Sequence, residues 1–499
     1  MRLPCFLLSA VLFAPGFAPA ADVPTPASSS PLTLDEAIRL ALANNANIKV
    51  QSYSRGIARA NLLAAYGQFD PSINFQRSYS QTDLPALASP DTGLRSPATF
   101  TQTDNYSLTL DGQMPWGLSY SLGGTSINQR GNYNGFRNNY DTTGGISVTQ
   151  PLLRGLGLGV NLSGIRLAKA NRGIADWTFR QLAIDTVTRV IVAYNELAFA
   201  REQLRISLGE RDSVARFLAQ NERRKELGTI SEADVIAARA QVASSEGLIL
   251  SSQRYVQVSE NTLRQLIGEK NFAFNNANPL VIEPPAPAAS VTVTPVDDLK
   301  IAYALRSDYQ AARLGVKKGH ISDDAARNQL LPRVDFVGSY GYNGNDDTFA
   351  TSRQMVRNED YRAYSAGVVV SVPLTFAQGR GQARAARLAL RQAEENVASV
   401  EQQIAVDVAN AANQIVTAQD RVKTARTALD LARQSLEAEM KKLQAGTGST
   451  FFVLDRQERL SSAELSFSRA LTDHHQALAT YDQALGRTLE NNHITLAKE

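Results

Sequence analysis

The chain has 499 residues, of which 43% are hydrophobic and 20% are charged, and its 51 Lys and Arg nearly balance its 48 Asp and Glu. A net charge this close to neutral gives no electrostatic basis for binding nucleic acid. The length allows two or three ordinary domains.

Residues 1–20 are predicted to be a signal peptide. Arg2 precedes an apolar core over residues 6–13, and Ala18-Pro19-Ala20 provides small residues for cleavage. The only cysteine, Cys5, lies within this peptide, so the mature chain is expected to lack disulfides and thiolate metal sites. No later apolar run reaches the roughly 20 residues of a membrane helix. An exported chain of this kind is expected to be either soluble or a β-barrel.

Residues 21–31 are rich in Pro and Ser and are predicted to be a flexible leader. A helix is expected to follow from Thr33, which has Glu36 at the capping-box position, and to continue through Tyr66. Pro71 ends this helix.

From Ser72 to about residue 152 the apolar period changes to two, which predicts β-strands. Polar, Gly-rich stretches at 83–99 and 128–143 are predicted to be long loops, and Pro115-Trp116-Gly117 a tight turn. Strands of about ten residues with long loops on one side are typical of an outer-membrane barrel. A soluble β-sandwich insertion is the alternative that this stretch leaves open.

Long helices follow the strands, over 156–227 and 379–443. Large apolar residues recur every seven positions in the second of them, with alanine three places after most, and this pattern predicts closely packed helical seams. The seam residues are Val408, Ile415, Val422, Leu429, Leu436 and Leu443, with Ala411, Ala418, Ala425 and Ala432. Similar heptads occur over 235–263 and 453–484. Heptads alone are also compatible with an ordinary coiled coil.

The chain contains an internal repeat. Pro332 and Phe336 lie 261 positions after Pro71 and Phe75, and Gly446-Thr447 lies 218 positions after Gly228-Thr229. A Pro-rich linker, 276–295, separates repeat 1 (32–275) from repeat 2 (296–488), and 489–499 forms a tail. Each repeat is predicted to run helix, strands, long helix, turn and helix. The strands occupy 72–152 and 333–373, and the turns 227–235 and 445–455. Repeat 1 has 39 more residues in its strand region, the size of an added hairpin.

This duplicated order resembles the outer-membrane efflux protein family typified by TolC. The resemblance rests on segments 32–42, 150–155, 227–235, 372–379 and 445–455, and it covers about 32 to 488.

The resemblance implies an α+β membrane protein. In this family a homotrimer forms one transmembrane β-barrel in the outer membrane of a Gram-negative bacterium, continuous with a long periplasmic α-helical barrel. It implies a passive exit duct of a tripartite efflux or type I secretion system. The implied partners are a periplasmic adaptor protein, an inner-membrane transporter and outer-membrane lipid. If the added hairpin, 105–129, joins the barrel, three copies give about 18 strands. The alternative is a periplasmic coiled-coil scaffold or adhesin with a soluble β head.

The resemblance also implies site residues at the helical turns. Asp234 matches an acidic position of the first turn, while the family's Asp-Val-Leu-Asp in the second turn is here Phe452 to Asp455. We therefore hypothesise a ring of Asp455 carboxylates beside an apolar Phe452 constriction. The alternative is that Phe452 packs as core against a neighbouring helix. The tyrosine and arginine that help to lock the family's pore fall at Leu443 and Gly448, so a polar lock is not expected.

The Gly-Thr turns, Gly228-Thr229 and Gly446-Thr447, correspond to the family's adaptor-docking surface. The glycines suit a left-handed position, and Thr229 is expected to cap the next helix. A purely structural turn is the alternative.

No catalytic residue, metal site or cofactor is predicted. The glycines of 155–159 lack the Lys and Ser/Thr of a phosphate loop, and His474-His475 has no metal ligand at helical spacing. The chain is therefore not expected to be an enzyme.

Overall fold

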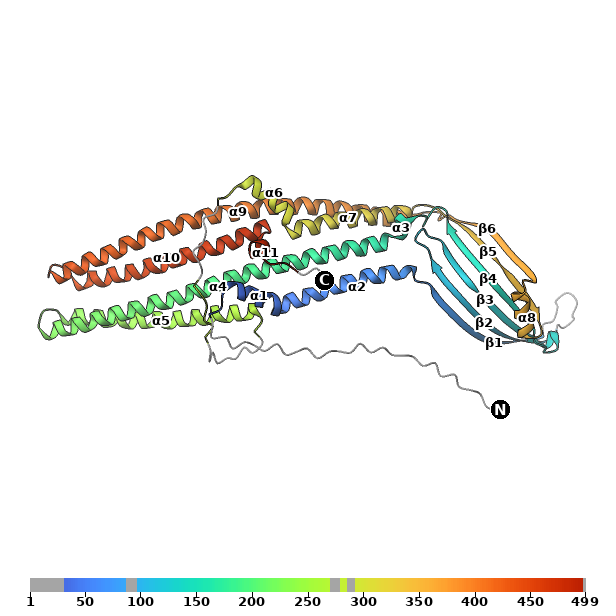
Figure 1. Ribbon diagram of the computed structural model, residues 1–499, viewed down its shortest axis with the longest axis horizontal. Helices are drawn as coiled ribbons and strands as arrows, with labels where there is room; N and C mark the ends of the chain where they lie inside the picture. The colour runs from blue at the N-terminus through green and yellow to red at the C-terminus, as the bar shows by residue number, and fades with distance from the viewer. Residues whose placement is uncertain (1–30, 87–96, 270–278, 285–291, 497–499) are drawn as a thin grey trace, which may run out of the picture.

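A computed structural model describes residues 31–86, 97–269, 279–284 and 292–496. The predicted signal peptide, nearly all of the leader and much of the Pro-rich linker lie outside these ranges. The molecule is long, with a sheet at one end and a layer of helices extending from it (Figure 1).

The first helical stretch is two helices, α1 (Leu34–Asn44) and α2 (Ala46–Tyr66), and the prediction of one continuous helix was wrong. Asn45 breaks it with a ψ of 128°. Its side chain accepts a hydrogen bond from the backbone of Asn47, and so caps α2, while donating to the carbonyl of Leu266 at 3.0 Å. A tertiary contact therefore fixes a break that the helical spacing does not reveal.

The strands form one antiparallel sheet of six in chain order. They are β1 (Ser72–Leu84), β2 (Thr99–Gln113), β3 (Ser119–Gly131), β4 (Tyr140–Pro151), β5 (Arg333–Asp346) and β6 (Tyr361–Ser371). The added hairpin of repeat 1 is β2–β3, and it lies within the sheet. The loops predicted at 83–99 and 128–143 are shorter than expected, because pairing extends to Leu84 opposite Thr99 and to Asn128 opposite Tyr140.

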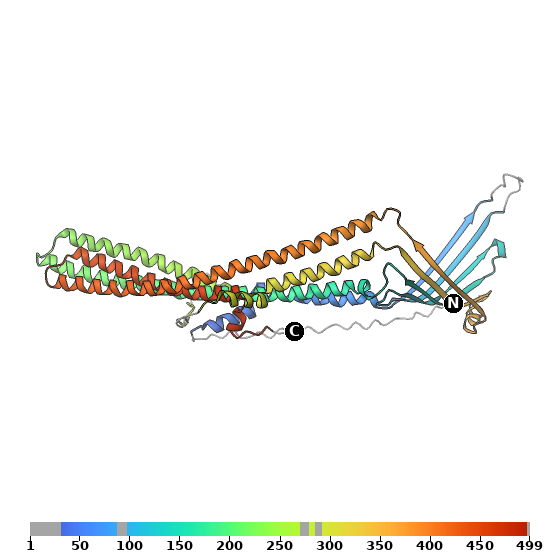
Figure 2. The ribbon, with the colours of Figure 1, turned by 90° about the horizontal axis from the view of Figure 1, so that it is seen from above.

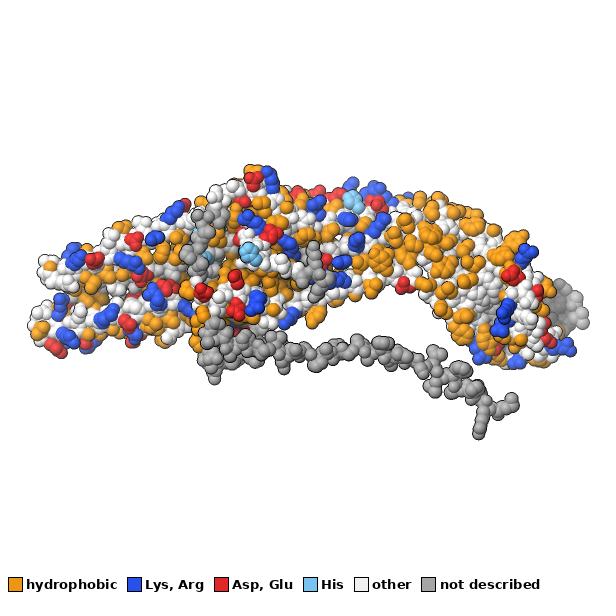
Figure 3. Space-filling model, viewed as in Figure 1, with side chains coloured by type: hydrophobic (Ala, Val, Ile, Leu, Met, Phe, Trp, Pro, Cys, Tyr) orange, Lys and Arg blue, Asp and Glu red, His pale blue; other side chains and the backbone are white. Residues whose placement is uncertain are grey.

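The register gives the sheet two different faces. The apolar face carries aligned large side chains, with polar groups mostly toward the strand ends farthest from the helices; one paired row runs Ile73, Leu110, Leu122, Ile146, Tyr340 and Tyr364. The polar face carries mostly hydroxyl, amide and glycine residues; one of its rows runs Gln76, Ser107, Thr125, Thr143 and Asn343. In Figure 3 hydrophobic side chains cover much of the sheet on the face toward the viewer. Alternation of period two is the cause of this division.

Long helices continue from the sheet as two antiparallel pairs. The pairs are α4 (Ser163–Glu226) with α5 (Glu232–Ile267) and α9 (Ala377–Gln444) with α10 (Thr450–Leu485). The 68 residues of α9 span about 100 Å at 1.5 Å per residue. Contact between α4 and α10 joins the pairs (Figure 2). The shorter helices are α3 (Leu158–Asn161), α6 (Pro295–Leu305), α7 (Ser307–Asn328) and α11 (Thr488–Asn491).

The predicted seams form the core between the helices. Val408, Ile415, Leu429 and Leu436 of α9 are buried, as are Ala411 and Ala418. On α5 the small residues Ala238, Ser245, Ser252 and Ser259 are also buried. A second core surrounds Tyr194, whose hydroxyl lies 2.9 Å from the carbonyl of Leu32 and 2.7 Å from that of Glu283. Within the described ranges, no helix combines the length and hydropathy needed to cross a membrane.

A helix between β5 and β6 has no counterpart in the sequence analysis. Helix α8 (Phe349–Arg357) follows β5 and packs on β4 and β5 at the end of the sheet farthest from the long helices (Figure 1). Its nine residues are too few for a clear helical period, so packing on the sheet decides its structure.

The layer has two open edges. We call β1, α2 and α5 the α5 edge, and β6 with α9 the α9 edge. Exposed large apolar residues lie along both: Val50, Tyr53, Ile57 and Leu63 on α2, Ile236, Leu250 and Val258 on α5, and Val406, Val416 and Leu431 on α9. Shallow open grooves of about 500 and 470 Å³ lie beside Val258 and Val416. The outer backbone groups of β1 and β6 have no neighbouring strand in the described sheet.

Candidate functional site: the helical tip and the α4–α10 seam

The end of the molecule opposite the sheet consists of two turns, α4 to α5 and α9 to α10, which we call the tip (Figures 1 and 2). Both turns use the same backbone hydrogen bonds. Thr229 N–H donates to Arg224 at 2.9 Å and Gly228 N–H to Lys225 at 2.8 Å, while Thr447 donates to Lys442 at 3.0 Å and Gly446 to Leu443 at 3.2 Å. These are Schellman motifs, which require a left-handed residue after the helix. Gly228 and Gly446 have φ of 73° and 77°, as predicted.

The role predicted for Thr229 was wrong. Its hydroxyl donates to the carbonyl of Arg224 at 2.8 Å and so closes the end of α4, and Thr447 does the same to Lys442 at 3.3 Å. Ser231 and Ser449 are the residues that cap α5 and α10. The hydroxyl reaches backward because the left-handed glycine reverses the chain just before it.

Asp234 belongs to a capping box. Its carboxylate accepts hydrogen bonds from the backbone N–H of Ser231 at 3.1 Å and from the hydroxyl of Ser231 at 2.7 Å. Negative charge at the start of α5 is also favoured by the helix dipole. Asp234 therefore has a structural partner within its own turn.

Asp455 is paired with two arginines of its own helix. Its carboxylate lies 2.9 Å from Arg459 and 3.3 Å from Arg456. The guanidinium groups offset much of its charge, so an Asp455 ring would have less effect on cations than the sequence hypothesis assumed.

Phe452 is 48% exposed and is therefore not part of the core of its own protomer. Its ring meets that of Phe451 edge to face, with centroids 5.7 Å apart. Two exposed aromatic rings thus stand together at the start of α10.

Sequence reasoning missed the ion pairs that hold the hairpins of the tip. Lys225 contacts Glu232 across the first turn, and Arg239 of α5 lies 2.9 Å from Glu222 of α4. In the second hairpin Arg433 of α9 lies 3.2 Å from Glu464 of α10. The charge types were visible in the sequence, but their pairing depends on how each hairpin is aligned.

The two hairpins meet at a polar cluster on the α4–α10 seam. Glu196 of α4 accepts hydrogen bonds from Tyr255 of α5, from Arg469 at 2.8 Å and from Gln476 at 2.7 Å. Burial alone would raise the pKa of Glu196, but these donors outweigh it and hold the pKa below its ordinary value. Burial and the neighbouring Glu196 carboxylate raise the pKa of Tyr255 to about 12. Glu196 therefore remains ionised and joins three helices.

Glu210, about four helical turns nearer the tip, lacks such a set of donors. It is buried, and burial raises its pKa above the ordinary value, opposed only by a hydrogen bond with Ser461. His474 of α10 is also buried, and burial lowers its pKa. The seam thus holds two buried or half-buried carboxylates. Hydrogen-bond donors compensate the burial of Glu196 well and that of Glu210 poorly.

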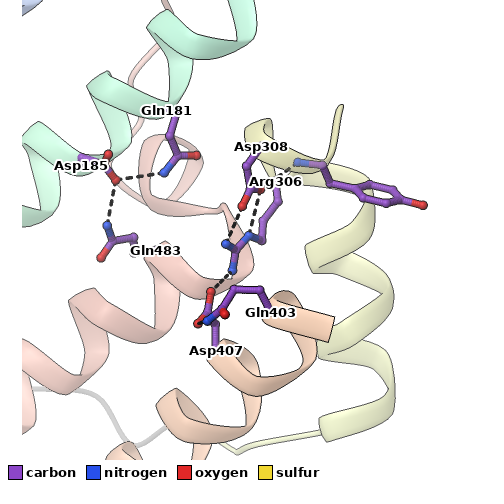
Figure 4. A network of polar contacts seen from close by, with 8 residues as sticks. Gln181, Asp185, Arg306, Asp308, Gln403, Asp407 and Gln483 are labelled. Atoms are coloured by element: carbon purple, nitrogen blue, oxygen red, sulfur yellow. Dashed lines mark hydrogen bonds and ion pairs between the residues drawn. The ribbon is translucent and has the colours of Figure 1, made fainter. Parts of the chain in front are cut away.

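Two further networks brace the helices on the sheet side of the seam (Figure 4). Arg306, at the junction of α6 and α7, donates to Asp308 at 2.7 Å and to Asp407 of α9 at 2.8 Å. Asp185 of α4 accepts from Gln181 and from Gln483 of α10, each at 2.9 Å. The first network fixes the α6–α7 junction to α9 within repeat 2, and the second fixes α4 of repeat 1 to α10 of repeat 2.

Comparison with known proteins agrees with this geometry. The sequence pattern described as outer membrane efflux protein matches residues 37–269 and 299–487. The chain is 26% identical over 316 residues to the outer membrane protein TolC of Vibrio cholerae, covering 61% of this chain and 68% of that protein.

Solved structures are similar over almost the whole chain. The outer-membrane channel OprN superposes with a TM-score of 0.69 at 17% identity, covering 91% of this chain and 89% of that one. The Campylobacter jejuni CmeC outer membrane channel gives 0.67 at 14% identity, covering 91% and 86%. At these sequence identities, the structural similarity shows a shared fold and nothing further.

Gly446→Ala is expected to weaken the tip. Nothing lies within 4 Å of the added methyl group, so the cost is the left-handed backbone alone, about 1 kcal/mol. Hydrogen–deuterium exchange at Thr447 should accelerate roughly fivefold. The control is Gly247→Ala, in open space within helix α5, which should stabilise slightly. Equal effects of the two changes would contradict the cap argument.

Glu210→Gln is expected to stabilise the protein at neutral pH. Because the folded state raises the pKa of this carboxyl group, its ionisation opposes folding once pH rises above the ordinary value of 4.5. Below that pH both states are protonated and the variant should gain nothing. Thermal unfolding at pH 4 and pH 7 measures the difference. Glu246→Gln, at an exposed position on α5, is the control and should show no such gain.

Proposed function

Because the chain belongs to the outer membrane efflux protein family, we propose that it is the exit duct of a tripartite efflux or type I secretion system. It lies in the outer membrane of a Gram-negative bacterium, with a large periplasmic portion. The duct is a passive conduit, in keeping with a family of channels rather than enzymes. An inner-membrane transporter supplies the energy, and a periplasmic adaptor connects the two. The two repeats, 32–275 and 296–488, are the units from which its wall is built.

The observation that carries the proposal is a sheet with one apolar face and two unpaired edges. Lipid cannot hydrogen-bond to backbone N–H and C=O groups, so a spanning sheet must close on itself. Six strands are too few for one copy to close around a duct, and strands of one copy can pair with those of the next. We propose a homotrimer of 18 strands, an even number within the range of such barrels.

The helical parts of the two edges support the joining of copies along the whole length of the molecule. The α5 edge and the α9 edge both carry exposed apolar residues, and each helical edge has a groove beside them. Joining the α5 edge of one copy to the α9 edge of the next covers these residues and pairs β1 with β6. The long helices then form an α-barrel in the periplasm, with the apolar face of the sheet toward outer-membrane lipid and the polar face toward the lumen.

The tip is proposed as the periplasmic entrance. Gly228, Thr229, Gly446 and Thr447 expose two similar turns for the adaptor. Phe452, exposed in one protomer, is proposed to constrict the pore as one of three, while Asp234 and Asp455 have local partners and contribute less charge than free carboxylates.

The mature protein in detergent is expected to have the mass of three chains and to conduct ions across a planar lipid bilayer. Light scattering and single-channel recording measure these properties. A monomer that is stable in buffer without detergent and carries no current would instead indicate a periplasmic scaffold or adhesin with a soluble β head.

Phe452→Ala is expected to raise the resting current severalfold, since ring removal widens a narrow apolar passage. Phe451→Ala removes the same ring one position earlier, where the helix turns it about 100° away, and should have a smaller effect. An unchanged resting current in Phe452→Ala, with trimers intact, would show that the constriction lies elsewhere.

A further inference from the structure

The arginines of the sheet are distributed unequally between its two faces. Arg77, Arg130 and Arg362 all lie on the apolar face, as their pairing with Tyr106, Gln102 and Tyr342 shows. Arg130 and Arg362 lie next to the strand ends farthest from the helices, whereas Arg77 is sixth of the 13 residues of β1. The one other arginine of the strands, Arg333, is at the opposite end beside Asp335. The polar face beyond Arg333 carries no Lys or Arg among the described strand residues.

Helix α8 lies on this same face. Its Ser352, fully buried, has its hydroxyl 2.6 Å from that of Thr142 and 3.0 Å from the carbonyl of Gly344. A Cβ at Gly344 would lie 2.1 Å from the carbonyl oxygen of Ser352, so this close contact requires glycine. Thr142 and Gly344 share the face of Ile146 and Tyr340, because they lie an even number of residues away. In the proposed barrel, α8 is therefore outside the wall.

The end of α8 is anchored to the sheet as well. Glu359, just after it, has a left-handed φ of 63°, which is unusual for a residue other than glycine. Its carboxylate accepts a hydrogen bond from the hydroxyl of Tyr342 at 2.8 Å. Glu359 is thus engaged with the sheet and Asp346 with Thr348, while Asp360 follows Glu359 in the exposed turn that connects α8 to β6.

Two arginines stand at this junction. Arg357 ends α8, and Arg362 follows five residues later on β6. Arg77 is paired with Asp104 at 3.2 Å, Arg130 donates to Gln102, and Arg353 stacks on Phe349. Arg357 and Arg362 are exposed and have no ion pair within the described part of the chain. Arg362 is one step along the apolar face from Tyr364, so it stands directly above the aromatic border of the apolar band.

We propose that α8 and the adjoining end of β6 bind a phosphate-bearing lipid of the outer leaflet, with Arg357 and Arg362 as the phosphate ligands. The proposal rests on the proposed function, which puts this face against lipid. Arginine suits the role, since its planar group donates two parallel hydrogen bonds to phosphate and remains charged. The tyrosines beneath it, Tyr340 and Tyr364, match the depth at which acyl chains give way to headgroups. An anchored helix holds Arg357 there at little entropic cost.

The test uses the intact detergent-solubilised protein and lipid A, a glycolipid with two phosphates, as the probe. Native mass spectrometry measures how much lipid A remains bound to the wild type and to Arg357→Gln/Arg362→Gln. Loss of two charges near the lipid surface should weaken retention roughly tenfold or more. The matched control is Arg384→Gln/Arg391→Gln, which removes two exposed arginines from α9 and should retain lipid A as the wild type does.

The outcomes separate this site from the channel function. Equal retention by the double variant and the wild type, or equal retention of lipid A stripped of its phosphates, would overturn the site. Loss of retention with ion current and oligomer unchanged would support it. If inorganic phosphate at equal concentration displaced lipid A completely, a site for free anions would replace the lipid site. A wild type that neither inserts into membranes nor conducts would remove the channel proposal itself.

Discussion

Backbone groups that have no partner at the two edges of the sheet dominate the physics of this chain. An amide or carbonyl in hydrocarbon without a hydrogen bond costs several kcal/mol, and β1 and β6 each present a row of them. The same two edges continue down α2, α5 and α9 as exposed apolar side chains. In the proposed trimer each chain is a curved piece of wall, and closure with further copies satisfies the strands and the helices together.

The internal repeat explains how one chain makes so long a wall. Each repeat supplies strands and an antiparallel helical pair, and the pairs meet along α4 and α10. Small residues on the seams let helices approach closely, which is why Ala, Ser and a few large apolar residues are enough to form a core only one helix thick. Glu196, with Tyr255, Arg469 and Gln476, holds the pairs at a defined alignment. Glu210 has fewer donors, so the seam is less firmly held toward the tip.

The two ends of the wall differ in chemistry because they meet different surroundings. At the tip, glycines in left-handed turns and local acid–base pairs leave Leu227, Phe451 and Phe452 as exposed apolar groups. At the other end, Arg130 and Arg362 lie on the apolar face of the sheet, above an apolar band with tyrosines at its border. In the proposed barrel this arrangement puts arginines toward lipid and leaves Arg333, beside the helices, as the one arginine of the described strands on the polar face.

The sequence by itself determined the periodic parts: period two over the strands, heptads over α5, α9 and α10, and the repeat that relates Gly228 to Gly446. These follow from local geometry, since one-sided burial imposes its period on the residues. Tertiary structure alone decided the break at Asn45, the length of the loops and helix α8. Each depends on an atom brought close by folding, such as the carbonyl of Leu266 at Asn45 or Thr142 beneath Ser352, and sequence spacing carries no record of such contacts.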